Sequence, residues 1–478
     1  MAPPSDDHEC GWRGYAQHLQ NDLDQLKAEV AELRRQKFGR TSEKAAKMPP
    51  IEREVRRGKK ADPEEGLQKR RERALLKEKL VAETVQVPVP DQERCCPHCQ
   101  GQDLRAVGDG KASTMYDYVP GFFRRRVIQR ETLSCPCGEY IVTAPSAEKS
   151  TDKTRYAPSF IAHLIVAKCS DCIPLYRLET QYNRIGVPIA RSTMTDLFHR
   201  NAELLAPLAK HLLARVAASE IVLADETPIR MQGTAKTAYL WTFLAGKDIT
   251  YVFSTSRSGD TPTTVLGGTT GTLVVDAYTG YNKVTTVEGR KRAGCMAHAR
   301  RKFFEASRGL PEAEIALNLI RDLYVVEHEA RERGIVGTAE HLALRQTRSR
   351  PILAHLFRWL RQQRGRHLPK GPMGKAIGYA LRNHRALTRF TTDPRLPPDN
   401  NRSEAALRIV ALGRKNYLFV GNEDAGTNIA GLYSLVATCA AHGKNPLEYL
   451  TDVLIRISSH PQSRIDELLP DRWQPAAT

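Results

Sequence analysis

Two short apolar runs that each lead into a carboxylate are the clearest pattern in the central part of the chain. Ile221, Val222 and Leu223 precede Asp225, and residues 273–275 run directly into Asp276. Short runs of this kind predict buried strands, and Pro228 is expected to end the first strand soon after Asp225. Alternation along that strand turns Glu226 to the opposite face. Neighbouring parallel strands bring their ends together, so the two carboxylates predict a site for a hard divalent cation.

The pattern between and after these two runs predicts the rest of an α/β core. Residues 238–254 alternate as two further strands, a helical turn follows near residue 260, and the next strand ends at Asp276. Three strands, a helix and a fourth strand, with acids on the first and fourth, is the order of an RNase H-like core. We expect its first part at 216–306, a helical insertion at 307–395, its second part at 396–442 and a helical tail at 443–478.

The third acidic candidate, Glu404, lies in the first turn of a predicted helix. Asn401 and Glu404 also have the spacing of a capping box, in which the glutamate would bond a backbone N–H at the helix start. Both interpretations of Glu404 stay open at this point.

The first residues of the chain repeat apolar positions at steps of four and three. This seam predicts a coiled-coil helix within residues 1–48 that joins two or more copies, or else an amphipathic helix packed on its own chain; it comprises Trp12, Ala16, Leu19, Leu23, Leu26, Val30 and Leu33. A basic linker at 49–85 follows, and such blocks of like charge often contact nucleic acid.

Cysteine pairs predict a small zinc-ribbon-like module at 86–145. Cys96 and Cys99 have the spacing of a zinc knuckle, and Cys135 and Cys137 form a second pair with one intervening residue where two are usual. Cys95 and His98 are substitute ligands, and ordinary cysteines of a small β domain are the alternative. A further pair, Cys169 and Cys172, is expected one turn apart on a helix, where cysteines more often belong to the core.

Residues 146–215 predict a helical segment with the pattern of a helix-turn-helix. A turn at Gly186 and Val187 separates two helices, the second of which begins near Ser192. In a DNA-binding motif Arg184 and Arg191 would contact phosphates or bases, whereas a generic helical hairpin is the alternative.

The charge balance favours a polyanionic partner. The net charge is +18 at pH 7, which is typical of proteins that bind nucleic acid. No apolar run approaches the roughly 20 residues that span a bilayer, so no membrane partner is expected, and the start has no signal-peptide pattern. We therefore expect a cytoplasmic, reducing compartment.

Basic and metal-binding residue types also gather after the fourth strand. Cys295 and His298 could lie near the active site or form half of a zinc site, or they could simply be packed in the core. Four cationic residues are expected phosphate contacts: Arg300, Arg301, Arg414 and Lys415.

Several segments together closely resemble the large transposase of the bacterial insertion-sequence family numbered sixty-six. They are FGRTSEK, the Cys-Pro-x-Cys module, CIPLYRLE, LADETPI, VVDAYTGYN, GCMAHARRKFFEA, DNNRSEAALR and GRKNYLFVG, and they extend from about residue 19 to near Leu454. The resemblance implies an Asp-Asp-Glu transposase with an RNase H-like core. Asp225 would be the first acid, Asp276 the second and Glu404 the third, with Asp399 as a nearby rival for the third.

The expected activity is DNA cleavage followed by joining. Three carboxylates would hold two Mg²⁺ or Mn²⁺ ions, with His298 as a further catalytic residue and structural Zn²⁺ on the cysteine module. Water would cut at the element's end, and the freed 3′-hydroxyl would attack target DNA. The expected partners are double-stranded DNA of the element ends and target, further copies in a homodimer or higher oligomer, accessory proteins of the same element, and the nucleoid. A metal-dependent nuclease and a DNA-binding regulator with an inactive core are the alternatives.

Overall fold

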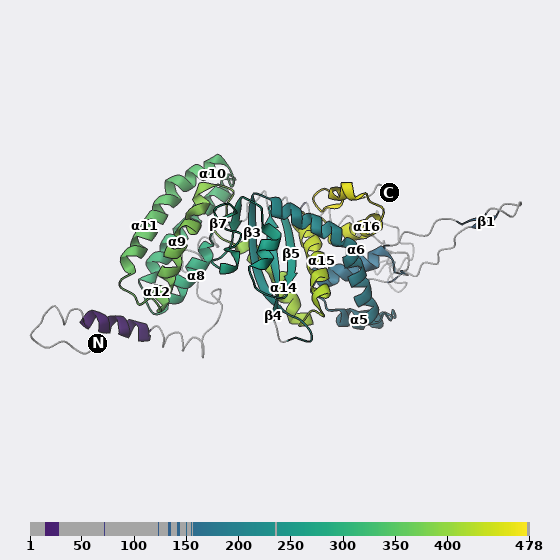
Figure 1. The fold of residues 1–478 in the computed structure, drawn as a ribbon, viewed down its shortest axis with the longest axis horizontal. Helices are drawn as coiled ribbons and strands as arrows, with labels where there is room; N and C mark the ends of the chain where they lie inside the picture. The colour runs from purple at the N-terminus through teal and green to yellow at the C-terminus, as the bar shows by residue number, and fades with distance from the viewer. Residues whose placement is uncertain are drawn as a thin grey trace, which may run out of the picture. The chain divides into compact units, whose positions relative to one another are not determined.

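The computed structural model describes residues 15–27, 71, 123, 132–134, 141–143, 150, 154, 156–234 and 237–475 (Figure 1). The chain divides into two compact units, one of residues 33–123 and one that combines residues 1–32 with 124–478. The elements from α4 onward belong to the second unit.

A five-stranded mixed sheet forms the centre of this unit. Its strands are β3 (Ile221–Arg230), β4 (Thr237–Ala245), β5 (Asp248–Ser254), β6 (Thr272–Val274) and β7 (Lys291–Ala293), in the order β5-β4-β3-β6-β7. The first three strands pair antiparallel, while β6 and β7 run parallel to β3. The predicted succession of three strands, a helix and a fourth strand is therefore present, since α7 (Asp260–Leu266) precedes β6.

Helices surround the sheet and account for most of the described chain. Before the sheet lie α4 (Pro158–Cys169), α5 (Leu175–Arg184) and α6 (Arg191–Ala218). After β7 come α8 (Met296–Ser307), α9 (Ala313–Glu332), α10 (Ala339–Leu344), η4, which is a π-helical turn (Arg345–Ser349), α11 (Arg350–Gln363), α12 (Pro372–Arg382), α13 (His384–Thr388) and η5 (Arg389–Thr392). The last helices are α14 (Asn401–Tyr417), α15 (Glu423–Ala441), α16 (Pro446–Arg456) and η6 (Gln462–Leu468), and η3 (Thr279–Tyr281) lies between β6 and β7.

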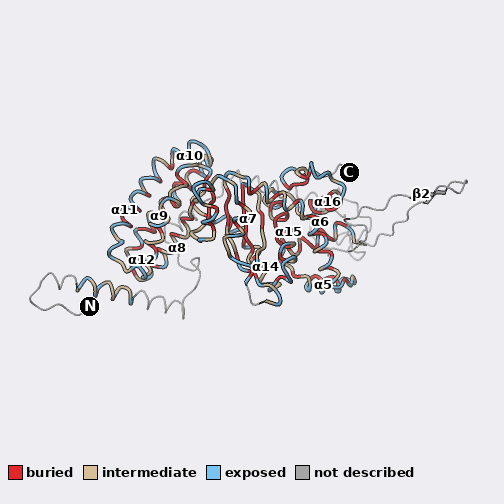
Figure 2. The backbone as a smooth tube through the Cα atoms, in the orientation of Figure 1, coloured by how far each residue is buried: buried red, intermediate tan, exposed pale blue. Residues whose placement is uncertain are grey.

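Alternation along β3 gives each face of the sheet its own core. Leu223 and Val274 face a cluster that continues into helices α8, α9, α11 and α12. Val222 and Leu273 face the other side, where they pack with residues of α6 and α7. Figure 2 shows the strands and the inward sides of the helices as mostly buried. The helices that follow α8 therefore share one apolar core with a face of the sheet.

Side chains of α15 form hydrogen bonds with the backbone groups at the outer edge of β5. The Ile249 backbone N–H donates to Thr438 Oγ1 at 2.9 Å, and the Thr438 hydroxyl donates back to the Ile249 carbonyl at 2.8 Å. The Tyr251 N–H donates to Ser434 Oγ at 2.8 Å. An uncovered edge strand would invite pairing with other chains, so these buried hydroxyls complete the sheet with a helix instead of a sixth strand.

Helix α14 and its flanking residues cover β3 in a similar way. Pairing with β6 ends at Leu223, while pairing with β4 continues to Arg230. Beyond that point three carbonyls of β3 accept hydrogen bonds from the α14 region: Ala224 from Asn400 Nδ2 (2.7 Å), Pro228 from Arg414 Nη1 (2.5 Å) and Arg230 from the Val420 N–H (2.9 Å). The long strand β3 is thus bound by a strand over its first residues and by a helix over the rest.

This arrangement corrects the prediction that Pro228 ends the strand near Asp225. The strand continues to Arg230, so Asp225 lies within it rather than at its end. The Pro228 carbonyl points away from β4, toward Arg414, and its nitrogen lies on the same side because both groups of one strand residue point the same way. The missing N–H of proline therefore removes no hydrogen bond of the β3–β4 ladder.

Residues 15–27 form a helix that carries part of the predicted heptad seam. Leu19, Leu23 and Leu26 have exposed fractions of 49%, 49% and 62%. The other seam residues except Ala16 lie outside the described residues, so the coiled coil stays a prediction. Of the predicted zinc module, the structure describes the antiparallel strands β1 (Thr132–Ser134) and β2 (Ile141–Thr143), which flank Cys135 and Cys137 in the sequence.

The predicted helix-turn-helix segment consists of α5, a turn with Gly186 at φ +78°, and α6. Helix α6 is 28 residues long, and its buried residues extend from Met194 to Ala217. It packs along its length against α15 and the sheet. The second helix is therefore an integral part of the core as well as the continuation of the turn.

Within the described residues, no helix combines the length and apolar character that crossing a membrane requires.

A buried ion pair is expected to hold the helices after α8 together. Arg345 donates to both carboxylate oxygens of Glu327 at 2.7 and 2.6 Å and to the carbonyls of Phe390 and Asp393. Because Glu327→Ala would leave this buried guanidinium without its counter-charge, we expect a loss of roughly 3–5 kcal/mol in local stability. Hydrogen exchange of amides in α9 and α11 measures this.

The matched control is Asp260→Ala, which removes the exposed Lys283–Asp260 pair. Exposed pairs contribute little, so exchange should stay unchanged in the control. Equal protection of α9 in both variants would contradict the assigned role of Glu327.

Candidate functional site

Asp225 is a carboxylate held in a largely buried position on β3. It lies on the same face of the strand as Leu223, which belongs to the core shared with α8. Burial is the main cause that raises the pKa of Asp225 to about 7, and the nearby charges of Glu226, Asp276 and Glu404 raise it further. A hydrogen bond from the Glu226 N–H to Asp225 Oδ1, at 2.9 Å, acts in the opposite direction.

Asp276 follows the adjacent parallel strand. Leu223 of β3 pairs with Val274 of β6. Side chains alternate with a period of two, so Asp225 and Asp276, each two residues further along, point to the same face of the sheet. The Val275 N–H donates to the Ala293 carbonyl at 3.0 Å, which extends the β6–β7 pairing up to Asp276. The Tyr278 N–H donates to Asp276 Oδ1 at 2.8 Å and fixes this carboxylate at the start of the following turn.

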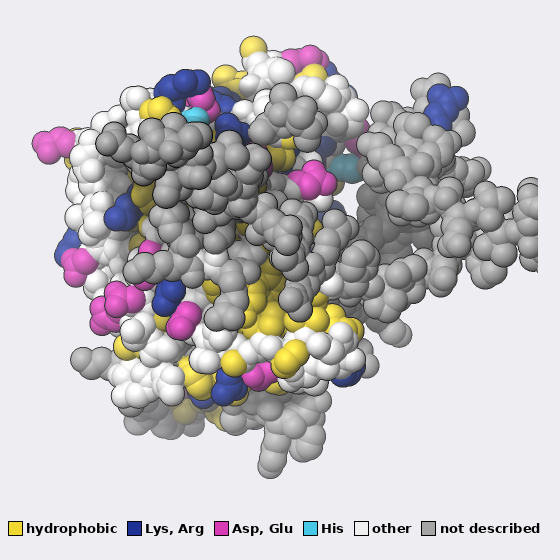
Figure 3. Space-filling view, turned by 90° about the vertical axis from the view of Figure 1, so that its right-hand side faces the viewer, with side chains coloured by type: hydrophobic (Ala, Val, Ile, Leu, Met, Phe, Trp, Pro, Cys, Tyr) yellow, Lys and Arg dark blue, Asp and Glu magenta, His cyan; other side chains and the backbone are white. Residues whose placement is uncertain are grey.

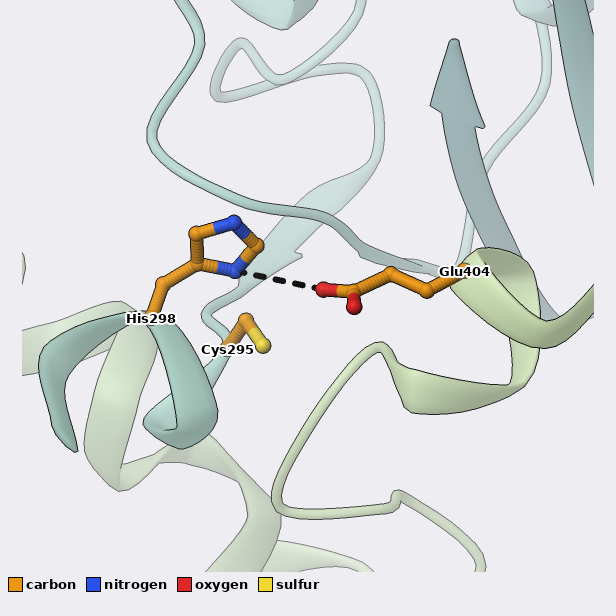
Figure 4. A group of neighbouring side chains, drawn as sticks. All are labelled: Cys295, His298 and Glu404. Atoms are coloured by element: carbon orange, nitrogen blue, oxygen red, sulfur yellow. Dashed lines mark ion pairs between the residues drawn. The ribbon is translucent and has the colours of Figure 1, made fainter. Parts of the chain in front are cut away.

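Glu404 reaches the same region from the first turn of α14. Its carboxylate lies 3.8 Å from His298 Nδ1 (Figure 4). It also lies 3.9 Å from Arg301 Nη2, and both partners belong to α8. The capping-box interpretation of Glu404 is wrong, because the N-cap residue is Asn400 and no side chain caps this helix. The helix start is instead held by Asn400, so Glu404 is left to face α8.

Asp399, the rival for the third acid, is already engaged. Its Oδ2 accepts the Tyr324 hydroxyl at 2.9 Å, and its Oδ1 accepts the Asn401 N–H at 3.1 Å. The charge of Glu404, in contrast, acts on Asp225 and helps to raise its pKa. The geometry therefore favours Glu404 as the partner of the two aspartates.

Cys295, His298 and Glu404 form a compact cluster. One potential ligand atom from each lies within 4.8 Å of the others, and Cys295, the N-cap residue of α8, lies with His298 of that helix beside the glutamate (Figure 4). Cys295 is fully buried, and burial raises the pKa of its thiol to about 12. Its sulfur accepts the Asn400 N–H at 3.3 Å, so Cys295 is bound to the backbone beside Glu404.

Two polar atoms of this cluster are buried without a hydrogen-bond partner among the described residues. They are Glu404 Oε1 and His298 Nδ1, which face one another at a distance too long for a hydrogen bond. Buried polar atoms without partners are costly in a folded protein. A carboxylate oxygen and an imidazole nitrogen in this state, next to the acidic pair Asp225 and Asp276, fit a bound divalent cation.

Glu226 points to the opposite face, as strand alternation predicts. Its carboxylate accepts the Tyr281 hydroxyl at 2.7 Å and two N–H groups of Arg257 at 2.9 and 2.6 Å. Glu226 is thus fully engaged away from the Asp225 side.

Asn400, which was not predicted from the sequence, connects three parts of the site. Its side chain donates to the Ala224 carbonyl and accepts the Ser403 hydroxyl, while its N–H donates to Cys295. Its position directly after Asp399, before a helix, was the only signal in the sequence.

The six candidate nucleic-acid contacts lie in different surroundings. Arg184 and Arg191 are exposed at the two sides of the α5–α6 turn. Figure 3 views the molecule from the end where α5 and α16 lie in Figure 1, and its described Lys and Arg side chains are interspersed with Asp and Glu.

The other four candidates lie on α8 and α14. Arg301 is half exposed and pairs with Glu404, Arg300 precedes it on α8, and Lys415 is exposed. Arg414 donates to Thr227 and Pro228, so it also fastens α14 to β3.

The remaining cysteine predictions divide into two groups. Cys96, Cys99, Cys135 and Cys137 lie outside the described residues, as do the substitutes Cys95 and His98. The prediction that Cys169 and Cys172 share a helix is wrong, because α4 ends at Cys169 and Cys172 has φ 57° in the next turn. Both thiols are buried, and burial raises the pKa of each, which agrees with the core role.

Comparison with known proteins identifies three segments of the chain. The model described as Transposase IS66 family matches residues 153–428, the IS66 C-terminal element matches 434–470, and the zinc-finger binding domain of transposase IS66 matches 93–138. The uncharacterized protein y4qI of Sinorhizobium fredii is 32% identical over 405 residues, 79% of this chain and 74% of the relative. The uncharacterized protein y4jD of the same organism is 29% identical over 412 residues, 81% and 80% of the two chains.

The raised pKa of Asp225 predicts a pH-dependent stability difference in metal-free protein. The folded-state pKa of about 7 exceeds the ordinary value of 3.8, so the contribution of Asp225 to stability is lost as the pH rises through this window. Asp225→Asn avoids that loss and should be more stable than the parent by on the order of 2–4 kcal/mol at pH 8, and by less at pH 5. Thermal denaturation in EDTA at pH 5 and pH 8 measures this difference in stability. If Asp225→Asn were equal to the parent in stability at pH 8, or less stable, the result would contradict the burial of this charge.

Proposed function

Because the chain belongs to the IS66 family of transposases, we propose that it cleaves DNA at the ends of an insertion sequence and joins the 3′ ends to target DNA, using Asp225, Asp276 and Glu404 as its acidic triad. The family membership indicates a transposase with a DNA partner. The residue assignment and the joining step are the proposal.

The observation that carries the assignment is the attachment of α14 to the part of β3 that β6 does not cover. Hydrogen bonds from Asn400, Arg414 and the backbone of Val420 to three β3 carbonyls fix the helix there. Glu404, in the first turn of that helix, then lies near enough to Asp225 to raise its pKa. An acid 128 positions beyond Asp276 is thereby brought to the aspartate pair.

The order of the strands supports an RNase H-like core. The first three strands are antiparallel, the first lies centrally, and the fourth and fifth join parallel to it on the other side. The first and second acids belong to the two central neighbours, β3 and the residues after β6. Helices α9 to α13 form the insertion between the second and third acids.

Asp225, Asp276 and Glu404 would hold the divalent cations, and His298 is a candidate fourth ligand or phosphate contact. Cations bound there supply stabilisation of the negative charge that develops on the attacking and leaving oxygens during phosphoryl transfer. Burial and the neighbouring carboxylates both disfavour the charged form of Asp225, so its ionisation depends on a compensating positive charge. Mg²⁺ or Mn²⁺ fits the oxygen-rich set better than Zn²⁺ does.

The protein's own cations complete the proposed site. Arg301 lies on the exposed side of Glu404 and Arg300 precedes it, so a phosphate beside the acids would meet guanidinium groups from α8. Arginine binds phosphate oxygens in a bidentate manner. We assign these residues to orientation of the scissile phosphate.

The zinc-finger domain is proposed to supply part of the DNA recognition. The matched residues 93–138 contain Cys96, Cys99, Cys135 and Cys137, and four thiolates make a structural Zn²⁺ site. Self-association through the N-terminal heptad seam would bring two such modules to two element ends. These parts remain proposals that accompany the catalytic assignment.

Substitution of the third acid separates Glu404 from its rival. Glu404→Gln should lower the rate of Mg²⁺-dependent DNA strand cleavage about a hundredfold or more, since several kcal/mol of charge stabilisation would be lost. Asp399→Asn is the matched control, because that carboxylate is bound by Tyr324 and Asn401, and it should retain activity within about tenfold. A cleavage rate lower in Asp399→Asn than in Glu404→Gln would overturn the assignment of Glu404 as the third acid.

Joining is tested separately from cutting. A pre-cleaved end with a free 3′-hydroxyl, incubated with supercoiled plasmid, should be joined by the parent protein and not by Asp225→Asn. Cleavage without any joined product would indicate a metal-dependent nuclease instead.

A further inference from the structure

A cationic groove lies at the edge of the sheet that β7 forms. It has a volume of about 640 Å³, and its walls come from the segment before and within β7 and from the junction of α12 and α13. Seven of its lining residues are basic or histidine and none is acidic: Arg290, Lys291, Arg292, Arg382, His384, Arg385 and Arg389. This groove is distinct from the cluster around Glu404.

Most of the positive charge of this groove has no carboxylate partner within the described chain, and Arg292 is the exception because the nearby charge of Asp276 acts on its guanidinium. Arg290 is fully buried, and its guanidinium donates only to neutral oxygens, those of Thr269, Ala217 and Ser219. Arg389 donates to the Arg292 carbonyl, which is likewise neutral. Neither hydrogen-bonding set includes a carboxylate, so Arg290 and Arg389 leave this wall of the groove at a positive potential, which favours an external anion.

The opposite wall presents charges to solvent. Arg382 and Arg385 are exposed at the end of α12 and in α13, and neither forms an ion pair with a described carboxylate. The pKa of His384 is lowered by burial and by the neighbouring Arg361 and Arg385, so this histidine adds a hydrogen-bonding group in a cationic environment. Two segments about ninety residues apart in the sequence thus present positive charge to one space.

The position of the groove relates it to the proposed catalytic site. Strand β7 begins in the groove wall and ends at Ala293, two residues before Cys295 of the Glu404 cluster. The strand spans about 10 Å at roughly 3.3 Å per residue, which corresponds to about three nucleotides along one DNA strand. DNA with its scissile phosphate at the acids can therefore place a nearby backbone segment in the groove.

We propose that this groove binds the sugar–phosphate backbone of the substrate DNA a few nucleotides from the scissile bond. The inference rests on the proposed function, which identifies DNA as the substrate. The binding test itself requires no catalysis. Several phosphates in succession match a groove with cations on both walls, whereas one small anion would engage only part of it. Backbone contacts of this kind are independent of base sequence.

The test measures binding of a fluorescein-labelled DNA duplex of arbitrary sequence to the full chain by anisotropy, in EDTA and over a salt series. Arg382→Ala combined with Arg385→Ala should weaken binding roughly tenfold, and the slope of log K against log salt should fall by about 1.8, since each lost phosphate contact contributes about 0.9. Arg382→Lys combined with Arg385→Lys should restore most of the slope, because lysine also contacts phosphate.

The matched control removes two positive charges elsewhere. Lys210→Ala combined with Lys247→Ala lowers the net charge equally, and Lys247 lies in the turn before β5, at the opposite edge of the sheet. Equal slopes for the groove variant and this control would overturn the proposal. Weaker binding to polyglutamate with an unchanged DNA slope would also overturn it, by indicating an acidic protein partner.

The outcome is independent of the acidic triad. If Asp225→Asn kept full cleavage activity, the proposed catalytic assignment would fail while the salt slopes could still identify the groove as a DNA contact. If the slopes did not respond, the groove proposal would fail and the triad would be unaffected.

Discussion

The hydrogen bonds between the α14 region and the free side of β3 are the constraint on which the candidate site depends. Strand β6 pairs with β3 only as far as Leu223, and the next carbonyls on that side need other partners. Asn400 supplies the first of them. The same residue holds Cys295 and Ser403, so the requirement to satisfy a strand edge also sets the position of Glu404 relative to Asp225.

The cost of this arrangement is electrostatic. The negative charges of Asp276 and Glu404 act on Asp225, where burial already disfavours the charged form. Nearby, Glu404 Oε1 and His298 Nδ1 are buried without hydrogen-bond partners among the described residues. Both features would be relieved by a cation, and the surrounding arginines would then meet the phosphate of a DNA substrate. Under the proposed function, metal binding, DNA binding and local stability would therefore be coupled at one place in the fold.

Much of this could be predicted from local sequence, because apolar runs, charge and motif spacing are local properties. The strand order up to Asp276 and the opposite orientation of Glu226 followed from periodicity. The continuation of β3 through Pro228 did not follow from periodicity, since a proline is tolerated within a strand only where the tertiary structure leaves its nitrogen unpaired. The sequence alone could not decide whether Glu404 belongs to a capping box or to the site. The fold decides it, because Asn400 takes the N-cap position through contacts with Ala224 and Cys295, which are remote in sequence. The groove beside β7 had no local signal, since its arginines come from two separated segments.

The most direct test of the central claim is a crystal structure of the full chain soaked with Mn²⁺, with anomalous scattering used to locate the ion. The account predicts an Mn²⁺ peak in contact with the carboxylate of Asp225 and with that of Asp276 or Glu404, and its loss in Asp225→Asn crystals. Mn²⁺ bound elsewhere in the chain, with none at Asp225, would contradict it.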